Sequence, residues 1–206
     1  MSTTAKALEA DFFNLLDEEN DFLALVVKSH YSIDKMLDLA LFECLPQADA
    51  LELKRVSMLL KVDFLTALGG LNQGTRKLFE LANSFRNTFA HDPYAVFNEK
   101  DEVKVAKALT SHKPPLVQEN FESEVKGSGV LKTLFAVCFL QAWVVFEKNC
   151  KSKVSNIVAA QLVSEALGRK IKQRPESMTV EEDFAERCGK LMAELYPGIE
   201  IAGDWN

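Results

Sequence analysis

The sequence predicts an all-α protein, and three observations support that class. Apolar residues recur at intervals of three and four positions in almost every window of the 206-residue chain. The alternation of apolar and polar residues that marks half-buried strands is nearly absent. The composition, 48% hydrophobic and 26% charged, is that of a folded chain. At this length about 70% of the unfolded surface can be buried, so a core needs neither disulfides nor a metal.

Helices are expected in the first half of the chain wherever an apolar stripe lies between a capping residue and a breaker. Four are predicted, over residues 7–18, 21–45, 51–68 and 72–92. Asn20 or Asp21 can cap the second helix. Gly69-Gly70 ends the third in the manner of a C-cap. Asn72 can start the fourth, which stops at Asp92-Pro93 because proline disfavours the helical conformation of the residue before it.

The second half of the chain is expected to hold a charged helix, a central core helix and a C-terminal helix. These cover residues 99–111, 133–146 and 180–195. The core helix can continue to Gly168, either as one very long helix or as two. We expect a helical bundle over residues 1–150 and a C-terminal helical extension over 151–206 that packs on the bundle.

Composition and local pattern exclude several classes of protein. The most apolar run, residues 133–146, is shorter than the roughly 20 residues that cross a bilayer. The N-terminal residues lack the pattern of a secretion signal. A net charge of −6 argues against nonspecific coating of nucleic acid, although it allows a local basic groove. We therefore expect a cytoplasmic protein that does not associate with membranes.

The four cysteines, Cys44, Cys138, Cys150 and Cys188, are widely spaced and form no CxxC pair. Most lie inside apolar helical patterns, where cysteine acts as a small hydrophobic residue. This favours buried thiols over disulfides or metal ligands, which are the alternatives. No cofactor and no metal are expected.

The segment Arg86-Asn87-Thr88-Phe89-Ala90-His91 carries the residues best suited to chemistry. An arginine can hold a phosphate through two hydrogen bonds and neutralise the charge that grows at a five-coordinate phosphorus. An imidazole can move protons near neutral pH. These two roles suffice for RNA cleavage by the ribose 2′-hydroxyl, which needs no metal-bound water. Both side chains can face one groove only near a helix end, and Pro93 is expected to release the turn that holds His91.

A structural interpretation of the same pair is that His91 only caps the carbonyl end of its helix and stabilises the helix dipole. His30 carries Asp34 four residues later on its helix, which suggests either a second catalytic pair or a satisfied helical pair.

The motif Arg86-Asn87-(x3)-His91 at a helix end resembles that of HEPN domains, which are helical bundles marked by an arginine, a polar residue, a short spacer and a histidine. The order of helices over roughly residues 20 to 95 is also similar to that of HEPN and mannitol-repressor-like helical proteins. The resemblance implies a HEPN-like antiparallel bundle of about five core helices with additional C-terminal helices. It further implies a metal-independent endoribonuclease site assembled across a homodimer.

By this resemblance, Arg86 would hold the phosphate, His91 would transfer protons, and Asn87 would orient the histidine or contact the phosphate. Some members of the family carry a tyrosine two residues after the histidine, which antitoxin nucleotidyltransferases modify. Here Tyr94 comes three residues after His91. This departure argues against the branch with that partner, and residues beyond about 150 exceed a minimal HEPN unit.

A basic stretch follows the core helix. Residues 148–174 hold seven lysines and arginines and the single acid Glu165, so the local charge is 7 − 1 = +6. The tight group consists of Arg169, Lys170, Lys172 and Arg174. It could follow an RNA backbone, or it could be a solvated helix end whose charges stabilise the dipole.

Three functional classes follow from these observations. The first is a ribonuclease of the toxin or antiphage-defence (abortive infection) type that acts on RNA as a homodimer. The alternatives are a noncatalytic HEPN-like regulator that binds a protein or nucleotide and a dimeric repressor accessory. An antitoxin or regulatory protein is a further candidate partner. No glycine-rich phosphate loop, HExxH sequence or nucleophile elbow supports another kind of enzyme.

Overall fold

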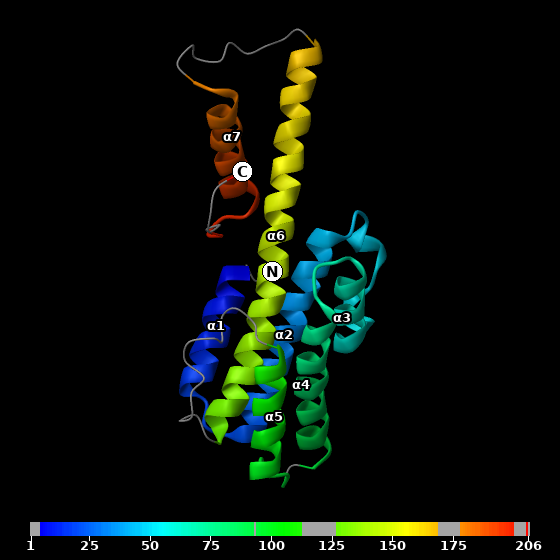
Figure 1. The fold of residues 1–206 in the computed structure, drawn as a ribbon, viewed down its shortest axis with the longest axis vertical. Coiled ribbons are helices and arrows are strands. Elements are labelled where there is room, and N and C mark those ends of the chain that lie inside the picture. Colours follow the sequence, from blue (N-terminus) through cyan, green and yellow to red (C-terminus); the bar gives the residue numbers. More distant parts are fainter. Residues whose placement is uncertain (1–4, 93, 113–126, 169–177, 200–204, 206) are drawn as a thin grey trace. The chain divides into compact units, whose positions relative to one another are not determined.

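The computed structural model describes residues 5–92, 94–112, 127–168, 178–199 and 205. These ranges contain helices and no strand, which confirms the all-α class. The α-helices are α1 (Ala5–Glu18), α2 (Phe22–Cys44), α3 (Met58–Ala67), α4 (Gln73–His91), α5 (Glu99–His112), α6 (Ser128–Gly168) and α7 (Val180–Leu195). Figure 1 shows them in chain order from blue to red.

The chain divides into two compact units, Met1–Phe146 and Glu147–Asn206. The boundary expected from the sequence, at residue 150, lies a few residues further along the same helix, α6. The packing of the C-terminal extension on the bundle stays a prediction. The basic group at residues 169–174 lies outside the described residues.

Three predicted capping positions in the first unit are confirmed. The Asp21 carboxylate accepts a hydrogen bond from the backbone N–H of Ala24 at 2.7 Å and starts α2. The Asn72 side chain accepts from the N–H of Thr75 at 2.9 Å and starts α4. After α3 the chain turns through Gly69, whose φ of +75° favours glycine.

The third predicted helix begins later than its apolar pattern suggested. Residues Ala48–Ala50 and Leu53–Arg55 form two short 3-10 turns, η1 and η2, and α3 starts only at Met58. The Ser57 hydroxyl accepts from the N–H of Leu60 at 3.4 Å. A serine that caps a helix in this way adopts an extended backbone and so prevents the helix from continuing through it.

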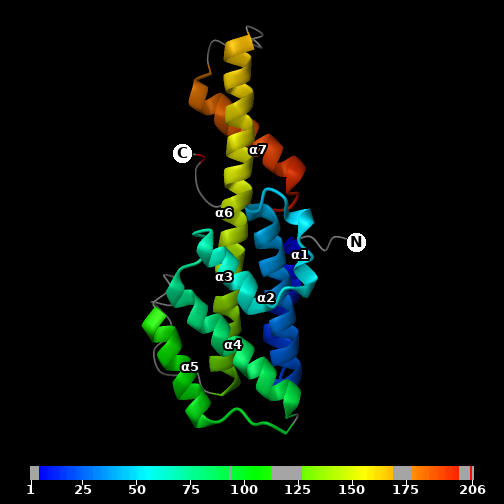
Figure 2. The ribbon, with the colours of Figure 1, turned by 90° about the vertical axis from the view of Figure 1, so that its right-hand side faces the viewer.

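The first part of α6 is the core of the first unit. Many of its side chains are buried; among the most buried are Leu131, Leu134, Phe135, Cys138, Phe139 and Ala142. The Phe139 ring stacks on Phe12 of α1 with centroids 4.2 Å apart. Figures 1 and 2 show this green part of the helix running among α1, α2, α4 and α5. The predicted central helix is therefore confirmed, as a single helix that reaches Gly168.

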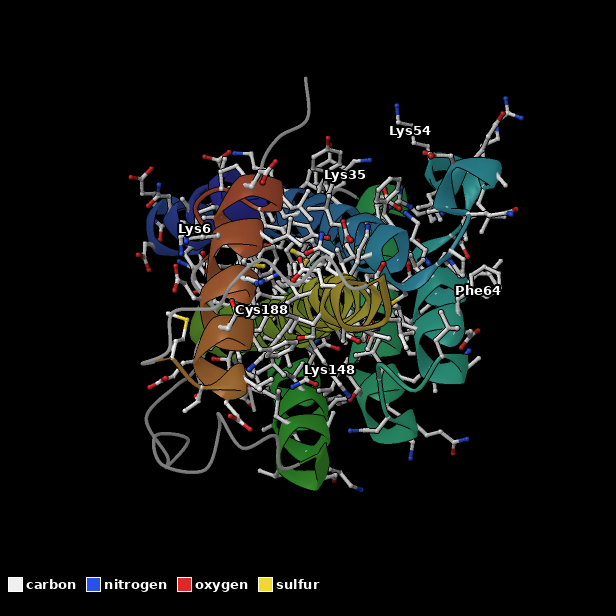
Figure 3. All side chains as sticks on the ribbon, turned by 90° about the horizontal axis from the view of Figure 1, so that it is seen from above. Lys6, Lys35, Lys54, Phe64, Lys148 and Cys188 are labelled. Carbon is white, nitrogen blue, oxygen red and sulfur yellow. The ribbon has the colours of Figure 1, made fainter. Side chains whose placement is uncertain are left out.

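The second unit pairs the rest of α6 with α7. The Arg187 guanidinium on α7 bonds Glu165 of α6 at 2.9 Å and Asp183 of its own helix at 2.8 Å. Cys188 is buried on the same helix and hydrogen-bonds the Ser155 side chain, and Figure 3 labels it on the side of α7 nearest α6. A capping box at Thr179 begins α7.

All four cysteines are thiols and none forms a disulfide. Cys138, Cys150 and Cys188 are buried, as expected, whereas Cys44 is only half-buried. Burial raises the pKa of the Cys138 thiol far above its ordinary range. These side chains therefore act as apolar packing groups and are poor nucleophiles.

The helix α6 is longer than the run of residues 133–146 suggested. By length and composition the span Ser128–Leu167 is enough to cross a membrane, and 56% of its most apolar stretch is buried in the protein. The central helix of a folded bundle has the same two properties.

Replacing Phe139 tests the core. The change Phe139→Ala removes a fully buried ring and leaves a cavity, so we expect a loss of about 3–5 kcal/mol in the free energy of unfolding. Val144→Ala on the same helix, where the side chain is 50% exposed, should change it by no more than about 0.5 kcal/mol. Urea unfolding followed by circular dichroism measures both, and a loss below about 1 kcal/mol for Phe139→Ala would contradict the packing.

Candidate functional site

The motif residues lie on the last turns of α4, and all three are exposed. Arg86 and Asn87 are adjacent, and the Arg86 Nη1 atom donates a hydrogen bond to Asn87 Oδ1 at 3.2 Å. His91 is the last residue of the helix. Among the described residues its imidazole has no hydrogen-bond or ion-pair partner. The structure thus presents the three side chains to solvent at a helix end.

Arg86 and His91 do not share one side of α4. The helix stays regular up to His91, and at ~100° per residue two positions five apart point about 140° away from each other. The buried face of α4 includes Ala82, Phe85 and Phe89. Arg86 follows Ala82 by four residues and borders this face, whereas His91 projects from the opposite side. One chain alone therefore does not bring the pair together.

The expected release of the turn at His91 is wrong. The N–H of Asp92 still donates to the Thr88 carbonyl at 2.9 Å, so the last turn is closed. Only at Asp92 does the backbone become extended, with φ −131° and ψ 96°. A proline restricts the residue immediately before it and no earlier one. The break therefore comes one residue too late to turn His91 toward Arg86.

A different histidine is the neighbour of Arg86 in the same chain. His30 lies on α2, which packs along α4, and its Nε2 donates to Asn83 Oδ1 at 3.2 Å. Asn83 precedes Arg86 by three residues, so the two side chains are neighbours on one side of α4. Asp34, the partner suggested by the sequence, instead bonds Lys61 at 2.7 Å. His30 is therefore tied to the motif helix.

The environment of His30 favours its neutral form. Burial is the main cause that lowers the pKa of the imidazole below its ordinary value of 6.5. The Asn83 bond and the charge of Asp34 raise the pKa, and the positive charges of Arg86 and Lys61 lower it. At neutral pH the ring thus carries one proton, on Nε2, and leaves Nδ1 as an acceptor.

A buried ion pair supports this part of the bundle. The Lys61 side chain of α3 is fully buried, and its ammonium lies 2.7 Å from a carboxylate oxygen of both Asp34 and Asp38 on α2. Two carboxylates neutralise the buried cation. Lys61 therefore joins α3 to α2 and does not present a charge to a ligand.

Sequence reasoning found Arg86, Asn87 and His91 but gave His30 the wrong partner. The i+4 spacing pointed to Asp34, and only the antiparallel contact of α2 with α4 brings His30 to Asn83. The basic residues Arg169, Lys170, Lys172 and Arg174 lie outside the described residues, and their role stays a prediction. Within the part of the chain that the structure describes, no group of three or more His, Cys, Asp or Glu side chains could hold a metal ion.

The pH dependence of stability tests the burial of His30. Because its pKa is lower in the folded chain than in the unfolded chain, the unfolded chain binds the proton more tightly. The stability contributed by the neutral ring is present above the ordinary value of 6.5 and is lost as the pH falls through the folded value. The thermal midpoint of the wild type should decrease as the pH is lowered from about 7.5 to about 5.5. In His30→Gln this decrease should be smaller. The exposed-histidine variant His91→Gln is the control and should keep it. Equal slopes in the wild type and His30→Gln would contradict the assignment.

Comparison with known proteins returns no family model, no curated protein and no solved structure that matches the chain.

Proposed function

We propose that the protein is a metal-independent endoribonuclease of the toxin or antiphage-defence type, whose site is completed by a second copy of the chain. One observation carries this proposal: Arg86, Asn87 and His91 are all exposed at the end of α4, where nothing in the described chain covers them. Three polar groups suited to phosphate binding and proton transfer thus remain available to a substrate.

A second copy supplies what one chain lacks. In a two-fold dimer the same surface of each chain meets itself, so the motif helices can pair. The Arg86 of one chain can then approach the His91 of the other, although within one chain they point about 140° apart. Large apolar side chains next to the motif support such an interface, since Tyr94 is 89% exposed and Val96 is 76% exposed.

The proposed reaction uses only groups of the chain and of the RNA. The 2′-hydroxyl attacks the adjacent phosphorus in line, and an imidazole takes its proton or gives one to the 5′-oxygen that leaves. Arg86 stabilises the charge that develops on the phosphoryl oxygens. Positioned acid–base groups are typically worth about 10²–10⁴-fold in rate. The products are a 2′,3′-cyclic phosphate, or a 3′-phosphate after its hydrolysis, and a 5′-hydroxyl.

A noncatalytic regulator is the second candidate, and one observation favours it. One hydrogen-bond donor of Arg86 already bonds Asn87, and His91 lies on the far side of the helix. A bundle that only binds a protein or nucleotide would not need Arg86 and His91 to come closer together. Cleavage assays separate the two candidates directly.

The catalytic proposal predicts that the purified wild type cuts total RNA in the presence of a chelator, while Arg86→Ala and His91→Ala each lose at least about 10²-fold in rate. Expression of the wild type should slow cell growth, whereas both variants should be tolerated. Sequencing of the RNA ends should reveal the cyclic or 3′-phosphate and the 5′-hydroxyl. A metal-activated water need not leave these ends.

Each variant must keep the wild-type helicity and thermal midpoint for that comparison to count. Thr88→Ala, which changes another exposed side chain of the same helix end, is the matched control and should cut at the wild-type rate. If folded His91→Ala cuts as fast as the wild type, the catalytic assignment is wrong and the regulator takes its place.

The composite site also predicts a two-fold dimer at micromolar concentration. Analytical ultracentrifugation should give twice the 23.0 kDa mass of the chain. Tyr94→Glu together with Val96→Glu should shift the equilibrium to the monomer, because unpaired charges would be buried at the interface. A wild type that stays monomeric at these concentrations would remove the basis for a site shared between chains.

A further inference from the structure

The face where α2 meets α4 holds three groups suited to an anion, of which the imidazole can donate once its Nδ1 is protonated. His30 projects from α2, and Asn83 and Arg86 project from successive turns of α4. The His30–Asn83 bond of 3.2 Å joins the two helices. Arg86 lies close enough to His30 that its charge acts on the imidazole. A guanidinium, a carboxamide and an imidazole are thus collected within one chain.

The Arg86 guanidinium is the exposed member of this group. It has five N–H donors, of which one, on Nη1, bonds Asn87. The remaining donors can form the two parallel bonds that phosphate oxygens accept. His30 is half-buried beside it and is held in place by Asn83. A fixed imidazole next to an exposed guanidinium gives a phosphate a defined position.

We infer that His30 and Arg86, with Asn83 as the anchor of the imidazole, form a phosphodiester subsite within each chain. The inference rests on the proposed function, because it takes RNA as the ligand. Within one chain, His30 is then the imidazole beside Arg86. His91 acts in the site that is shared with the partner chain. His30 is a binding and positioning residue in this scheme.

The bond to Asn83 survives protonation of the ring. Nε2 donates to Asn83 Oδ1 whether the imidazole is neutral or charged, so a second proton goes to Nδ1 without breaking the anchor. The charged groups that act on His30 are Asp34 of its own helix, Lys61 of α3 and Arg86 of α4. Lys61 is already neutralised by Asp34 and Asp38.

A bound phosphodiester therefore adds a negative charge to this face and favours the protonated imidazole. By thermodynamic linkage, a ligand that favours protonation of the imidazole binds more tightly when the imidazole is protonated. The affinity for a phosphodiester should rise as the pH falls. A diester keeps one negative charge across the neutral range, so this rise comes from the protein and not from the ligand.

The experiment uses the full-length protein and a fluorescent 2′-O-methyl uridine tetranucleotide, which cannot be cut because it has no free 2′-hydroxyl. Fluorescence anisotropy gives its affinity at about pH 7.5, 6.5 and 5.5 for the wild type and for His30→Gln, His91→Gln and Arg86→Gln. The wild type should bind up to about tenfold more tightly at the lowest pH if the ligand raises the pKa by about one unit.

His30→Gln should lose most of that pH dependence, whereas His112→Gln, measured alongside as a histidine variant outside the candidate site, should keep it. Arg86→Gln should bind weakly at every pH. A structural role for His30 would alter stability but would not remove the dependence of affinity on pH in a folded variant. The subsite is refuted if folded His30→Gln keeps the wild-type pH dependence, if His91→Gln alone abolishes it, or if the wild type does not bind the probe at pH 5.5.

A second measurement covers the case in which His30→Gln does not fold. The chain has three histidines, so their imidazole C–H signals can be separated by NMR and assigned through the His91 and His112 variants. The probe should raise the titration midpoint of the His30 signal in the wild type. An unchanged midpoint would overturn the inference. Because the probe is not cleaved, these outcomes do not depend on whether the protein cuts RNA.

Discussion

The apolar side of α4 is buried against the rest of the first unit, and this burial sets the rotation of the helix. Leu78, Phe79, Phe85 and Phe89 have to face inward, and α2 packs along the same side. With the helix held in this rotation, Arg86 emerges beside α2 and His91 emerges on the side that faces solvent. The directions of the Arg86 and His91 side chains follow from this rotation, because α4 stays regular to its last residue.

The two sides of α4 suggest two tasks. The side next to α2 carries Arg86, Asn83 and His30, which are groups that can hold a phosphate. Lys61 of α3 forms an ion pair with α2, so its charge is not available to the anion. On the opposite side of α4, His91 is exposed and can contact a partner. We propose a second copy of the chain as the partner, because a two-fold axis through the exposed end of α4 could place each His91 near the Arg86 of the other chain. In this account the dimer is a condition for activity.

Sequence patterns predicted the helices well where local chemistry decides them. The caps at Asp21 and Asn72 and the stop at Asp92 rest on residues adjacent in the chain. The start of α3 was missed because the Ser57 cap outweighed an apolar periodicity that continued upstream of it. The partner of His30 was missed for another reason. Spacing within α2 pointed to Asp34, but the actual partner, Asn83, is 53 positions away, and only tertiary packing brings it near. The phosphate chemistry proposed for Arg86 and His91 rests on their residue types, whereas their opposed directions depend on how α4 is packed.

The most direct test of the central claim, that the site is completed between two chains, is complementation in mixed dimers. Arg86→Ala and His91→Ala are each inactive alone in this account. When the two are unfolded together and refolded as a mixture, half of the dimers should contain one chain of each kind. Such a dimer has one site with both defects and one site with an intact Arg86 and an intact His91 from different chains. RNA cleavage by the mixture should therefore recover to roughly a quarter of the wild-type rate. A mixture that stays as inactive as the separate variants, although mixed dimers are present by mass spectrometry, would contradict a site shared between chains.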